Sequence, residues 1–248
     1  MLTDDDREIR RGRITGSTAA ACLGLSPYVT PLAAWLEITG RNAEHDEATR
    51  AVFRRGSVLG PALIRYGAEE IASELRRTVA IDRPGTLAHR DLAWAAVSAD
   101  AVYLALEVPG APPGVVELDD LVVRDVDAIA IYVGEAKVVN AEHAGEWGAE
   151  WSDQIPAYVG VQAEWELLHY PEARAVILPV LLGAQQQLAT YVWRGDAALR
   201  AGLVDALGAW HRRHVVTDTP PPAMAPLDAA IIGNVWKARR RAVDLGAA

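Results

Sequence analysis

A charged end on an apolar, strand-like run constrains this chain most. Residues 127–140 read DAIAIYVGEAKVVN, in which isoleucine and valine alternate with alanine and tyrosine up to Val133. Such alternation, rich in β-branched residues, is typical of a buried β-strand. Because strand side chains repeat every second residue, Glu135 and Lys137 are predicted to share a face with the apolar side chains. Two charges at the end of a buried strand need either each other or a bound metal ion.

Both partners for these charges are chemically reasonable. The Glu135 carboxylate and the Ala136 carbonyl are oxygen ligands, which Mg²⁺ prefers while keeping several waters. Lys137 would then lie beside one of those waters. The alternative is a simple ion pair on a half-exposed strand, and an isolated Glu-x-Lys leaves it open.

A second acid upstream favours the metal site. Residues 92–106, LAWAAVSADAVYLAL, form another strand-like run in which Asp100 is the only charge. A carboxylate inside an apolar run is costly unless it is paired or has a function. If the two strands are neighbours, Asp100 and Glu135 can share one ion. Residues 107–120, which are rich in proline, glycine and acid, are then a surface excursion between antiparallel strands.

Composition excludes several classes of protein. The 248 residues, 51% of them hydrophobic, suffice for one substantial core, so a single domain is expected, with its core at about 10–222 and a helical tail at 223–248. The net charge of −9 argues against a basic nucleic-acid coat but not against a local basic groove. One cysteine, Cys22, excludes a disulfide framework and a four-cysteine metal site. With no signal peptide and no membrane-length apolar run, a cytoplasmic protein is expected.

The first motif along the chain is a basic turn. Arg10, Arg11 and Arg13 precede Thr15-Gly16-Ser17 and a run of small residues that predicts a helix, with Ser17 as its N-cap. Free amides at a helix start, with arginines beside them, form a site for a phosphate. An ordinary capped helix next to a solvated turn is the alternative.

Polar residues also mark the predicted helices. Residues 53–77 are predicted to form a helix. Gly60-Pro61 suits the start of that helix, because proline is favoured in a first turn. A further helix from Pro156 places Gln162 near the middle of an apolar arc, with Glu166 close by. A buried amide needs a partner, which is a metal-bound water, a phosphate oxygen or a backbone carbonyl. Two strands at 175–182 and 188–193 and a closing helix at 197–214 follow, and the histidines of its HRRH end are weak evidence for zinc.

The order of these motifs resembles that of the YqaJ-type viral recombinase family, which includes the phage lambda exonuclease. The segments that carry the resemblance are Arg10 to Ser17 (Arg-x-Gly-x-Ile-Thr-x-Ser), Leu23 to Trp35 (which contains Leu-Gly-x-Ser-x-x-x-Thr-Pro), Ser98-Ala99-Asp100 with Glu135-Ala136-Lys137 (a PD-(D/E)xK signature), Trp151 to Gln162 (Trp-x-x-x-x-Pro-x-Tyr and a following glutamine) and Tyr191 to Asp196. The chain departs from the family in two places. Gly60 stands where a metal-site glutamate is expected, which puts two-metal catalysis in doubt unless another acid, Glu69, Glu70 or Glu166, fills the gap. The excursion between Asp100 and Glu135 is also long for the family.

The resemblance implies an α/β fold, with a mixed central β-sheet flanked by helices and a PD-(D/E)xK nuclease-like core. It implies a metal-dependent DNA exonuclease that digests linear duplex DNA from 5′ to 3′. Implied roles are metal binding (Mg²⁺ or Mn²⁺) by Asp100, Glu135 and the Ala136 carbonyl, water orientation and deprotonation by Lys137, assistance by Gln162, and DNA contact by Arg10, Arg13, Ser17 and Tyr158. A ring-shaped homo-oligomer, such as a trimer, and a single-strand annealing partner are implied as well.

Two alternatives stay open at the level of sequence. A catalytically weakened relative would bind DNA ends or a recombination partner without cutting, and Gly60 is its main support. An endonuclease on the same core would also cut closed circles.

Overall fold

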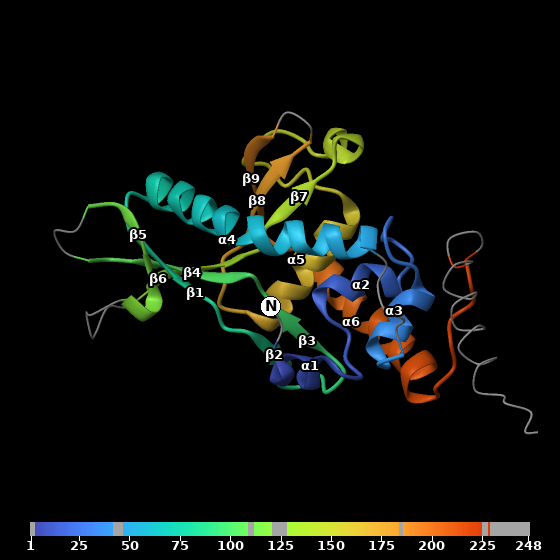
Figure 1. The fold of residues 1–248 in the computed structure, drawn as a ribbon. Coiled ribbons are helices and arrows are strands. Elements are labelled where there is room, and N and C mark those ends of the chain that lie inside the picture. Colours follow the sequence, from blue (N-terminus) through green and yellow to red (C-terminus); the bar gives the residue numbers. More distant parts are fainter. Residues whose placement is uncertain are drawn as a thin grey trace, which may run out of the picture.

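The computed structural model describes residues 3–41, 47–108, 112–120, 128–183, 186–224 and 228 (Figure 1). The helices are α1 (Asp4–Arg10), α2 (Gly16–Cys22), α3 (Pro31–Ile38), α4 (Glu47–Leu75), α5 (Ala157–His169) and α6 (Ala197–His211), with short helical turns η1 (Leu118–Asp120), η2 (Ala141–Glu146) and η3 (Arg212–Val216). The strands are β1 (Thr78–Asp82), β2 (Thr86–Ala88), β3 (Ala96–Ser98), β4 (Ala101–Leu106), β5 (Gly114–Glu117), β6 (Ala128–Gly134), β7 (Lys137–Val139), β8 (Val176–Leu182) and β9 (Gln187–Trp193).

A mixed sheet organises the described part of the chain. Its strands run in the order β5-β1-β4-β6-β8-β7, and β9 pairs with β8 outside this path. The pairs β1–β4, β4–β6 and β8–β9 are antiparallel, whereas β5 joins β1, and β6 and β7 join β8, in parallel. A separate ribbon pairs β2 with β3. The sheet confirms the predicted α/β class with a mixed central sheet.

Helices cover both faces of this sheet. Adjacent residues of β4 enter different cores, because Val102 packs in the cluster that contains α5 and Tyr103 in the cluster that contains α4. This is the period-two alternation of a strand buried on both sides. Helices α2, α3 and α6 form a third cluster with the outer side of α5. In Figure 1, α4 lies across one side of the sheet and α5 lies near the molecule's centre.

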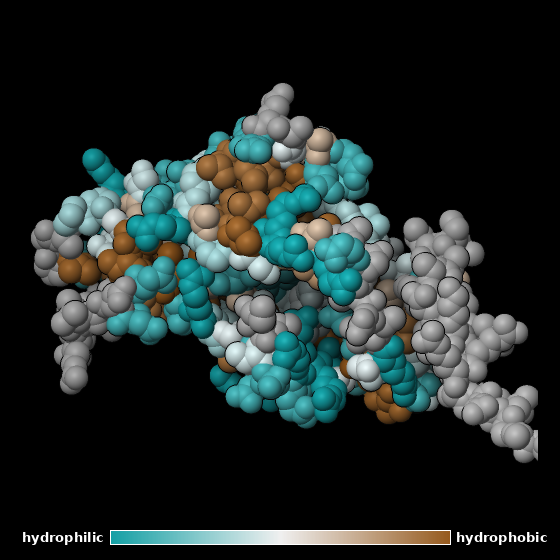
Figure 2. Space-filling view, in the orientation of Figure 1, coloured by the Kyte–Doolittle hydropathy of each residue, from teal (hydrophilic) through white to brown (hydrophobic). Residues whose placement is uncertain are grey.

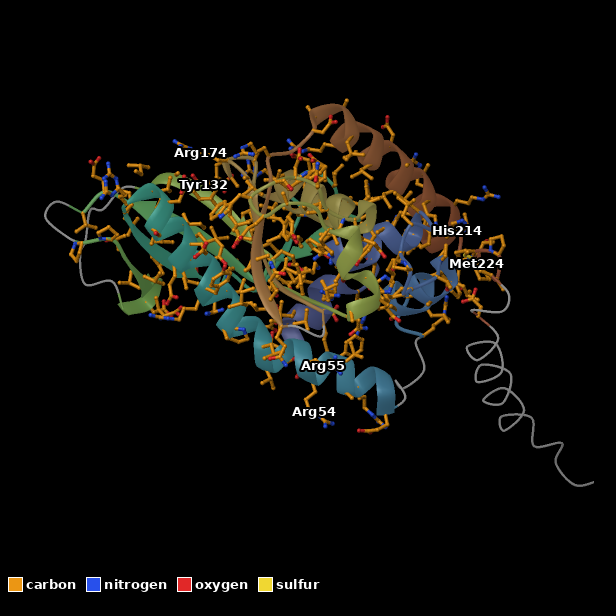
Figure 3. The ribbon with its side chains drawn as sticks, turned by 90° about the horizontal axis from the view of Figure 1, so that it is seen from above. Arg54, Arg55, Tyr132, Arg174, His214 and Met224 are labelled. Atoms are coloured by element: carbon orange, nitrogen blue, oxygen red, sulfur yellow. The ribbon has the colours of Figure 1, made fainter. Side chains whose placement is uncertain are left out.

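The long helix α4 corrects one prediction. It runs unbroken from Glu47 to Leu75, so Gly60 and Pro61 lie inside it and not at its start. Proline removes one backbone N–H from the helix ladder. Pro61 is exposed, so the unpaired carbonyl faces solvent, where water can satisfy it. Arg54 and Arg55 project outward from the preceding turns (Figure 3).

Other strand predictions need adjustment. The surface excursion predicted at 107–120 contains a strand, β5, which pairs with β1. The sequence reading identified neither of these two strands. The strand predicted over residues 127–140 is two strands, because Glu135 and Ala136 leave the ladder between β6 and β7. Its first half is less buried than expected, and Ile129 is exposed. Asp127 and the predicted tail helix, apart from residues 223, 224 and 228, lie outside the described residues.

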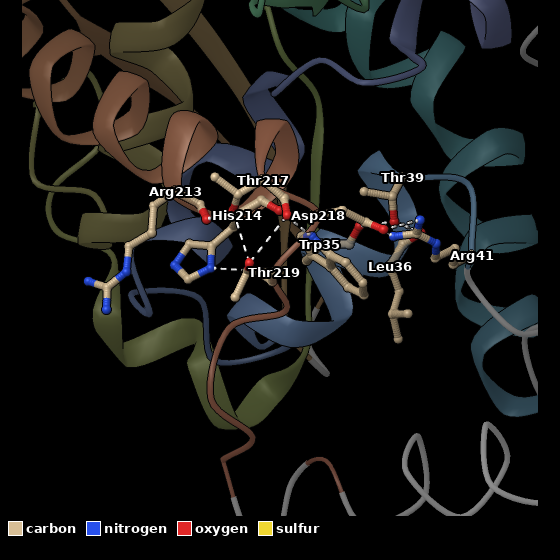
Figure 4. Close-up of polar contacts among 9 residues, drawn as sticks. All are labelled: Trp35, Leu36, Thr39, Arg41, Arg213, His214, Thr217, Asp218 and Thr219. Atoms are coloured by element: carbon tan, nitrogen blue, oxygen red, sulfur yellow. Dashed lines mark hydrogen bonds and ion pairs between the residues drawn. The ribbon is translucent and has the colours of Figure 1, made fainter.

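The histidines of the HRRH end make structural contacts, with His214 buried and His211 half-buried. The carbonyl of His214 accepts a hydrogen bond from Trp35 Nε1 at 2.9 Å, and His214 Nδ1 lies 2.9 Å from the Thr219 carbonyl (Figure 4). His211 Nε2 reaches the Gly12 carbonyl at 2.8 Å. These bonds tie η3 and α6 to α3 and to the turn after α1, and they supply the partners that buried imidazoles need.

The surface is mostly polar, with apolar patches. Figure 2 shows one such patch over the β8–β9 hairpin, where Leu188 is exposed. Within the described ranges, no helix has both the length and the apolar character needed to span a bilayer.

Candidate active site

Five of the nine predicted site residues line one cavity. A hollow of about 290 Å³ is lined by Arg10, Thr15, Gly16, Ser17, Val97, Ser98, Asp100, Glu135, Gln162 and Glu166. Five of these, Arg10, Ser17, Asp100, Glu135 and Gln162, were site candidates from the sequence. A larger cavity of about 440 Å³, beside Trp147 and Tyr191, contains none of the candidates.

Strand pairing brings the two acids together. Ala101 of β4 lies opposite Gly134 of β6, so Asp100 and Glu135 flank the same end of one antiparallel pair. Asp100 lies at a bend between β3 and β4 and not within a continuous strand. Its Oδ2 accepts a hydrogen bond from the Ala136 N–H at 3.0 Å, which links the acid directly to the Glu-Ala-Lys segment. The predicted neighbouring of these two strands is confirmed.

A chain of polar contacts then crosses from the sheet to α5. Lys137 Nζ donates to Glu135 Oε1 and to Gln162 Oε1, both at 2.7 Å. Gln162 Nε2 in turn donates to Glu166 Oε1 at 3.2 Å. Gln162 and Glu166 are four residues apart, so they share one face of the helix. The amide that the sequence placed in an apolar arc has its partners here.

Negative charge is crowded in this cavity. Burial, followed by the charge of Glu135, raises the pKa of Asp100 to about 7, although that side chain keeps solvent contact. The same two causes raise the pKa of Glu166 well above its usual range. Burial alone would lower the pKa of Lys137, but the charge and hydrogen bond of Glu135 outweigh it and raise that pKa. Lys137 is therefore a cation among three acids.

Glu166 has a second unusual feature. Its side chain is buried, and its Oε2 is one of the few buried polar side-chain atoms without a hydrogen-bond partner. A buried carboxylate oxygen without a donor costs stability, so such an atom calls for a proton or an ion. The spacing from Gln162 pointed to Glu166, but its burial and lack of a donor follow only from the tertiary structure.

These acids fit a divalent cation that keeps much of its water. Among the described residues, no three His, Cys, Asp or Glu side chains converge closely enough to enclose an ion. Mg²⁺ does not need such an enclosure, since it is commonly held by one or two carboxylates and several waters. Asp100 and Glu135 supply two carboxylates at one cavity, and Glu166 Oε2 supplies an oxygen without a donor.

The cavity is also lined by groups suited to a phosphate. Arg10 Nη1 donates to Ser98 Oγ at 3.1 Å, and Arg10 Nη2 lies 3.4 Å from Ser17 Oγ and 3.3 Å from Glu37 Oε1. A guanidinium with neighbouring hydroxyls can bind phosphate oxygens by charge-assisted hydrogen bonds. The N-cap of α2 is Thr15 and not Ser17, and the Ser17 hydroxyl, 3.1 Å from Thr15 Oγ1, lines the cavity. The sequence reading had not assigned Ser98 to the phosphate site.

Four candidates are not among the lining residues of the cavity. Ala136 and Lys137 are joined to it by their hydrogen bonds with Asp100, Glu135 and Gln162, whereas Arg13 and Tyr158 are not. Arg13 points to backbone carbonyls, with Nε 3.0 Å from the Ala93 oxygen and Nη1 2.6 Å from the Ile9 oxygen. Tyr158 is half-buried, and its ring meets that of Tyr28 edge-on at 5.7 Å between centroids.

Two other acids and Gly60 also lie outside the lining of the cavity. Glu69 pairs with Arg65 on the exposed side of α4, and Glu70 does not line the cavity either. A Cβ atom at Gly60 would meet nothing within 4 Å.

Known proteins place this arrangement in a family. The fold is similar to a crystal structure of an alkaline exonuclease (LHK-Exo) from Laribacter hongkongensis, with a TM-score of 0.53, 14% identity, and coverage of 96% of this chain and 99% of that one. The structure of LHK-Exo in complex with dAMP gives a TM-score of 0.54 at 15% identity, with the same coverage. Comparison with curated protein sequences gives no match. The model of the YqaJ-like viral recombinase domain matches residues 7–169, which is more than half of the chain, so the chain belongs to that family.

Proposed function

We propose that this protein is a metal-dependent DNA exonuclease of phage or prophage recombination type, digesting linear duplex DNA from 5′ to 3′. The observation that carries the proposal is the composition of one cavity. Asp100, Glu135 and Glu166 line it together with Arg10, Ser17 and Ser98. Membership of the recombinase family and the fold shared with an alkaline exonuclease support it.

Asp100, Glu135 and the Ala136 carbonyl would hold Mg²⁺ or Mn²⁺, with Glu166 as an additional acid beside them. When bound, the ion would neutralise charge on the scissile phosphate and lower the pKa of a coordinated water. Crowding of the carboxylates supports this assignment, because a cation would offset the repulsion that raises the pKa values of Asp100 and Glu166.

Lys137 would orient the attacking water and stabilise negative charge. The raised pKa of Lys137 keeps it protonated, so it acts as a hydrogen-bond donor. It can accept a proton from the water only after the charge of the neighbouring acids, which raises that pKa, is neutralised. Gln162 fixes the ammonium group by accepting from it at 2.7 Å and by donating to Glu166 on its other side. The water that Lys137 orients therefore has a fixed partner.

Arg10, Ser17 and Ser98 would bind the 5′ phosphate of the resected strand. The test compares Arg10→Ala with Arg13→Ala, whose guanidinium faces backbone carbonyls instead of the cavity. We expect Arg10→Ala to lower the preference for 5′-phosphoryl over 5′-hydroxyl duplex about tenfold, which is the scale of a lost charge-assisted hydrogen bond. Arg13→Ala should keep the preference. Equal ratios in the wild type and Arg10→Ala would place the phosphate elsewhere.

The wider setting is proposed on family grounds and on charge. A ring of subunits, such as a trimer, would let an acidic chain of net charge −9 point basic residues at one DNA channel. A single-strand annealing protein is the proposed partner, and the cytoplasm of a bacterial or phage-infected cell is the proposed location.

One assay tests the activity itself. End-labelled linear duplex and closed circular duplex are incubated with Mg²⁺, Mn²⁺ or a chelator. An exonuclease releases mononucleotides from the linear DNA only, and only with the metal. Cutting of circles indicates the endonuclease alternative. Tight binding of ends without hydrolysis in either metal indicates the weakened relative, for which Gly60 was the sequence argument.

A further inference from the structure

One of the segments that resemble the family contributes no residue to the lining of the cavity. The segment Leu23 to Pro31 forms the loop between α2 and α3. Within it, Ser26 Oγ accepts hydrogen bonds from the N–H groups of Tyr28 at 3.2 Å and Val29 at 3.1 Å. Thr30 caps α3 through the Ala33 N–H. The serine and the threonine thus fix a turn that presents Tyr28, whose exposed fraction is 57%.

Two other rings brace Tyr28. The Tyr158 ring of α5 lies 5.7 Å away at an interplanar angle of 87°, and the His143 ring of η2 lies 5.4 Å away at 80°. Both are edge-to-face contacts, which are favourable geometries for aromatic pairs. His143 is held in turn by Glu146, with Nδ1 at 2.6 Å from Oε1. We call Tyr28, Tyr158 and His143 the aromatic platform.

The platform lies close to the cavity. Tyr158, Gln162 and Glu166 follow one another at steps of four along α5, so they lie on one side of the helix. Four residues advance about 6 Å along a helix axis, so Tyr158 is one turn from Gln162. His143 belongs to η2, which follows the strand that begins with Lys137.

The size of the cavity bears on what reaches the platform. The cavity has a volume of about 290 Å³, which suits a single strand end better than paired DNA. We therefore take the strand whose phosphate enters it to have its terminal bases unpaired. Unpaired bases lose their stacking partners, and an exposed aromatic ring restores stacking for any base.

We propose that Tyr28 is a stacking surface for an unpaired nucleobase of the strand whose phosphate enters the cavity. The inference rests on the proposed function. Glu142 and Glu146 beside His143 disfavour a phosphate at the platform, and they leave a neutral base as the preferred contact. Tyr158 and His143 hold the ring in place, so Tyr28 and not Tyr158 is the residue that touches DNA.

A fluorescence titration tests the platform without hydrolysis. Single-stranded oligonucleotides with a 5′ phosphate carry 2-aminopurine either at the 5′ end or ten nucleotides away, and a chelator prevents cutting. Stacking on Tyr28 is expected to quench the terminal probe and not the distant one. Tyr28→Ala should abolish the quench and weaken binding roughly 5- to 100-fold, in line with the loss of one base–aromatic contact.

Two variants serve as controls. Tyr28→Phe keeps the ring and should behave as the wild type, because stacking does not need the hydroxyl. Leu25→Ala removes an exposed apolar side chain from the same loop and should leave the quench unchanged. Melting curves check that all variants fold.

The outcomes separate this inference from the proposed function. A wild type that degrades linear duplex with metal but does not quench the terminal probe overturns the platform alone. So does Tyr28→Ala with an unchanged quench, or with a changed oligomeric state and unchanged DNA binding. A wild type that neither binds nor cuts DNA overturns both.

Discussion

Two buried glutamates on α5 differ in what surrounds them. Glu164 Oε2 accepts hydrogen bonds from Trp193 Nε1 at 2.7 Å and from the Asp196 N–H at 2.9 Å, and Glu164 Oε1 accepts from Arg200 Nε at 2.7 Å. Glu166 receives one bond, from Gln162, and its Oε2 receives none. The two residues lie about 200° apart around the helix, so they face opposite sides.

The difference teaches how to tell a structural acid from a functional one. Burial of a carboxylate is costly in both cases. Around Glu164 the cost is offset by a cation and two N–H donors, and the result joins α5 to β9 and α6. Around Glu166 it is offset only in part, by the Gln162 amide and the charge of Lys137, while another acid, Glu135, opposes its ionisation. One side of α5 thus holds the fold together, while the other side is left for chemistry.

The largest predicted effect lies on the functional side. Lys137→Ala is expected to lower the rate of hydrolysis by roughly 10²–10⁴-fold, the usual scale for a group that acts on the attacking water. The variant should still fold, because the lysine fills no apolar core, but losing the cation beside Glu135 should lower its stability. End-labelled duplex degradation and a melting curve measure the two quantities. Cleavage near the wild-type rate would reject the assignment of Lys137.

The second effect lies on the structural side. Glu164→Gln removes the charge that faces Arg200 and replaces one of the two accepting oxygens by an NH2 donor, which then faces either Arg200 or the N–H groups of Trp193 and Asp196. The free energy of unfolding should fall by about 2–3 kcal/mol, at the bottom of the range for broken buried pairs because Arg200 is partly exposed. Hydrolysis well below the melting temperature should persist. A variant that is stable but inactive would reverse the roles of the two glutamates.

Glu166→Gln should show the opposite pattern. The variant should weaken metal binding about tenfold, the scale for a supporting group at a metal site, without lowering the stability of the metal-free protein. Isothermal titration with Mn²⁺ measures the affinity independently of activity. An unchanged affinity together with lost stability would make Glu166 structural.

The same variant predicts a pH effect with a definite sign. Because the folded pKa of Glu166 lies above its ordinary value of 4.5, the folded state binds more protons than the unfolded state between those two values. The stability of the metal-free wild type therefore falls as pH rises through that window. Glu166→Gln has no such titrating group and does not lose stability in this way. The melting temperature of the metal-free variant, relative to that of the metal-free wild type, should therefore be higher at pH 8.5 than at pH 5.5. Asp100 titrates in the same direction in both proteins.

Local patterns predicted much of this site. The apolar run ending in Glu135 and Lys137 and the lone Asp100 in a second run placed two acids at one sheet end, because neighbouring antiparallel strands bring such positions together. The helical spacing put Gln162 on an inner face. These inferences depend on periods of two and four residues, which the sequence displays directly.

Other features depend on distant parts of the chain. The β1–β5 pair is parallel, and β2, β3 and β4 lie between its two strands in the sequence. No local pattern therefore reveals the pair. The basic turn does not show which arginine faces the cavity. Arg10 faces it while Arg13 turns to backbone carbonyls, and Gly12 between them adopts a φ of 70° that redirects the chain. A missing donor at Glu166 is likewise a property of packing and not of spacing.

The smallest effect is expected at Gly60, and it decides whether Glu166 fills the place of the expected family acid. Gly60 lies inside α4, outside the positive-φ glycines, and a Cβ there meets nothing within 4 Å. Gly60→Glu should therefore fold, with a gain of about 0.5 kcal/mol from better helix propensity.

Two models then differ for the metal. If the acid at this position is simply missing, the new carboxylate lowers the Mg²⁺ concentration needed for half-maximal rate. If Glu166 already supplies the acid, that concentration changes by less than about twofold, or rises through like-charge repulsion, and this is the result we expect. Gly56→Glu, one turn earlier on α4 and equally open, is the matched control for added charge. A several-fold lower Mg²⁺ requirement in Gly60→Glu but not in Gly56→Glu would show a vacant ligand position, and the contrast between Glu164 and Glu166 would then need a reason other than the metal.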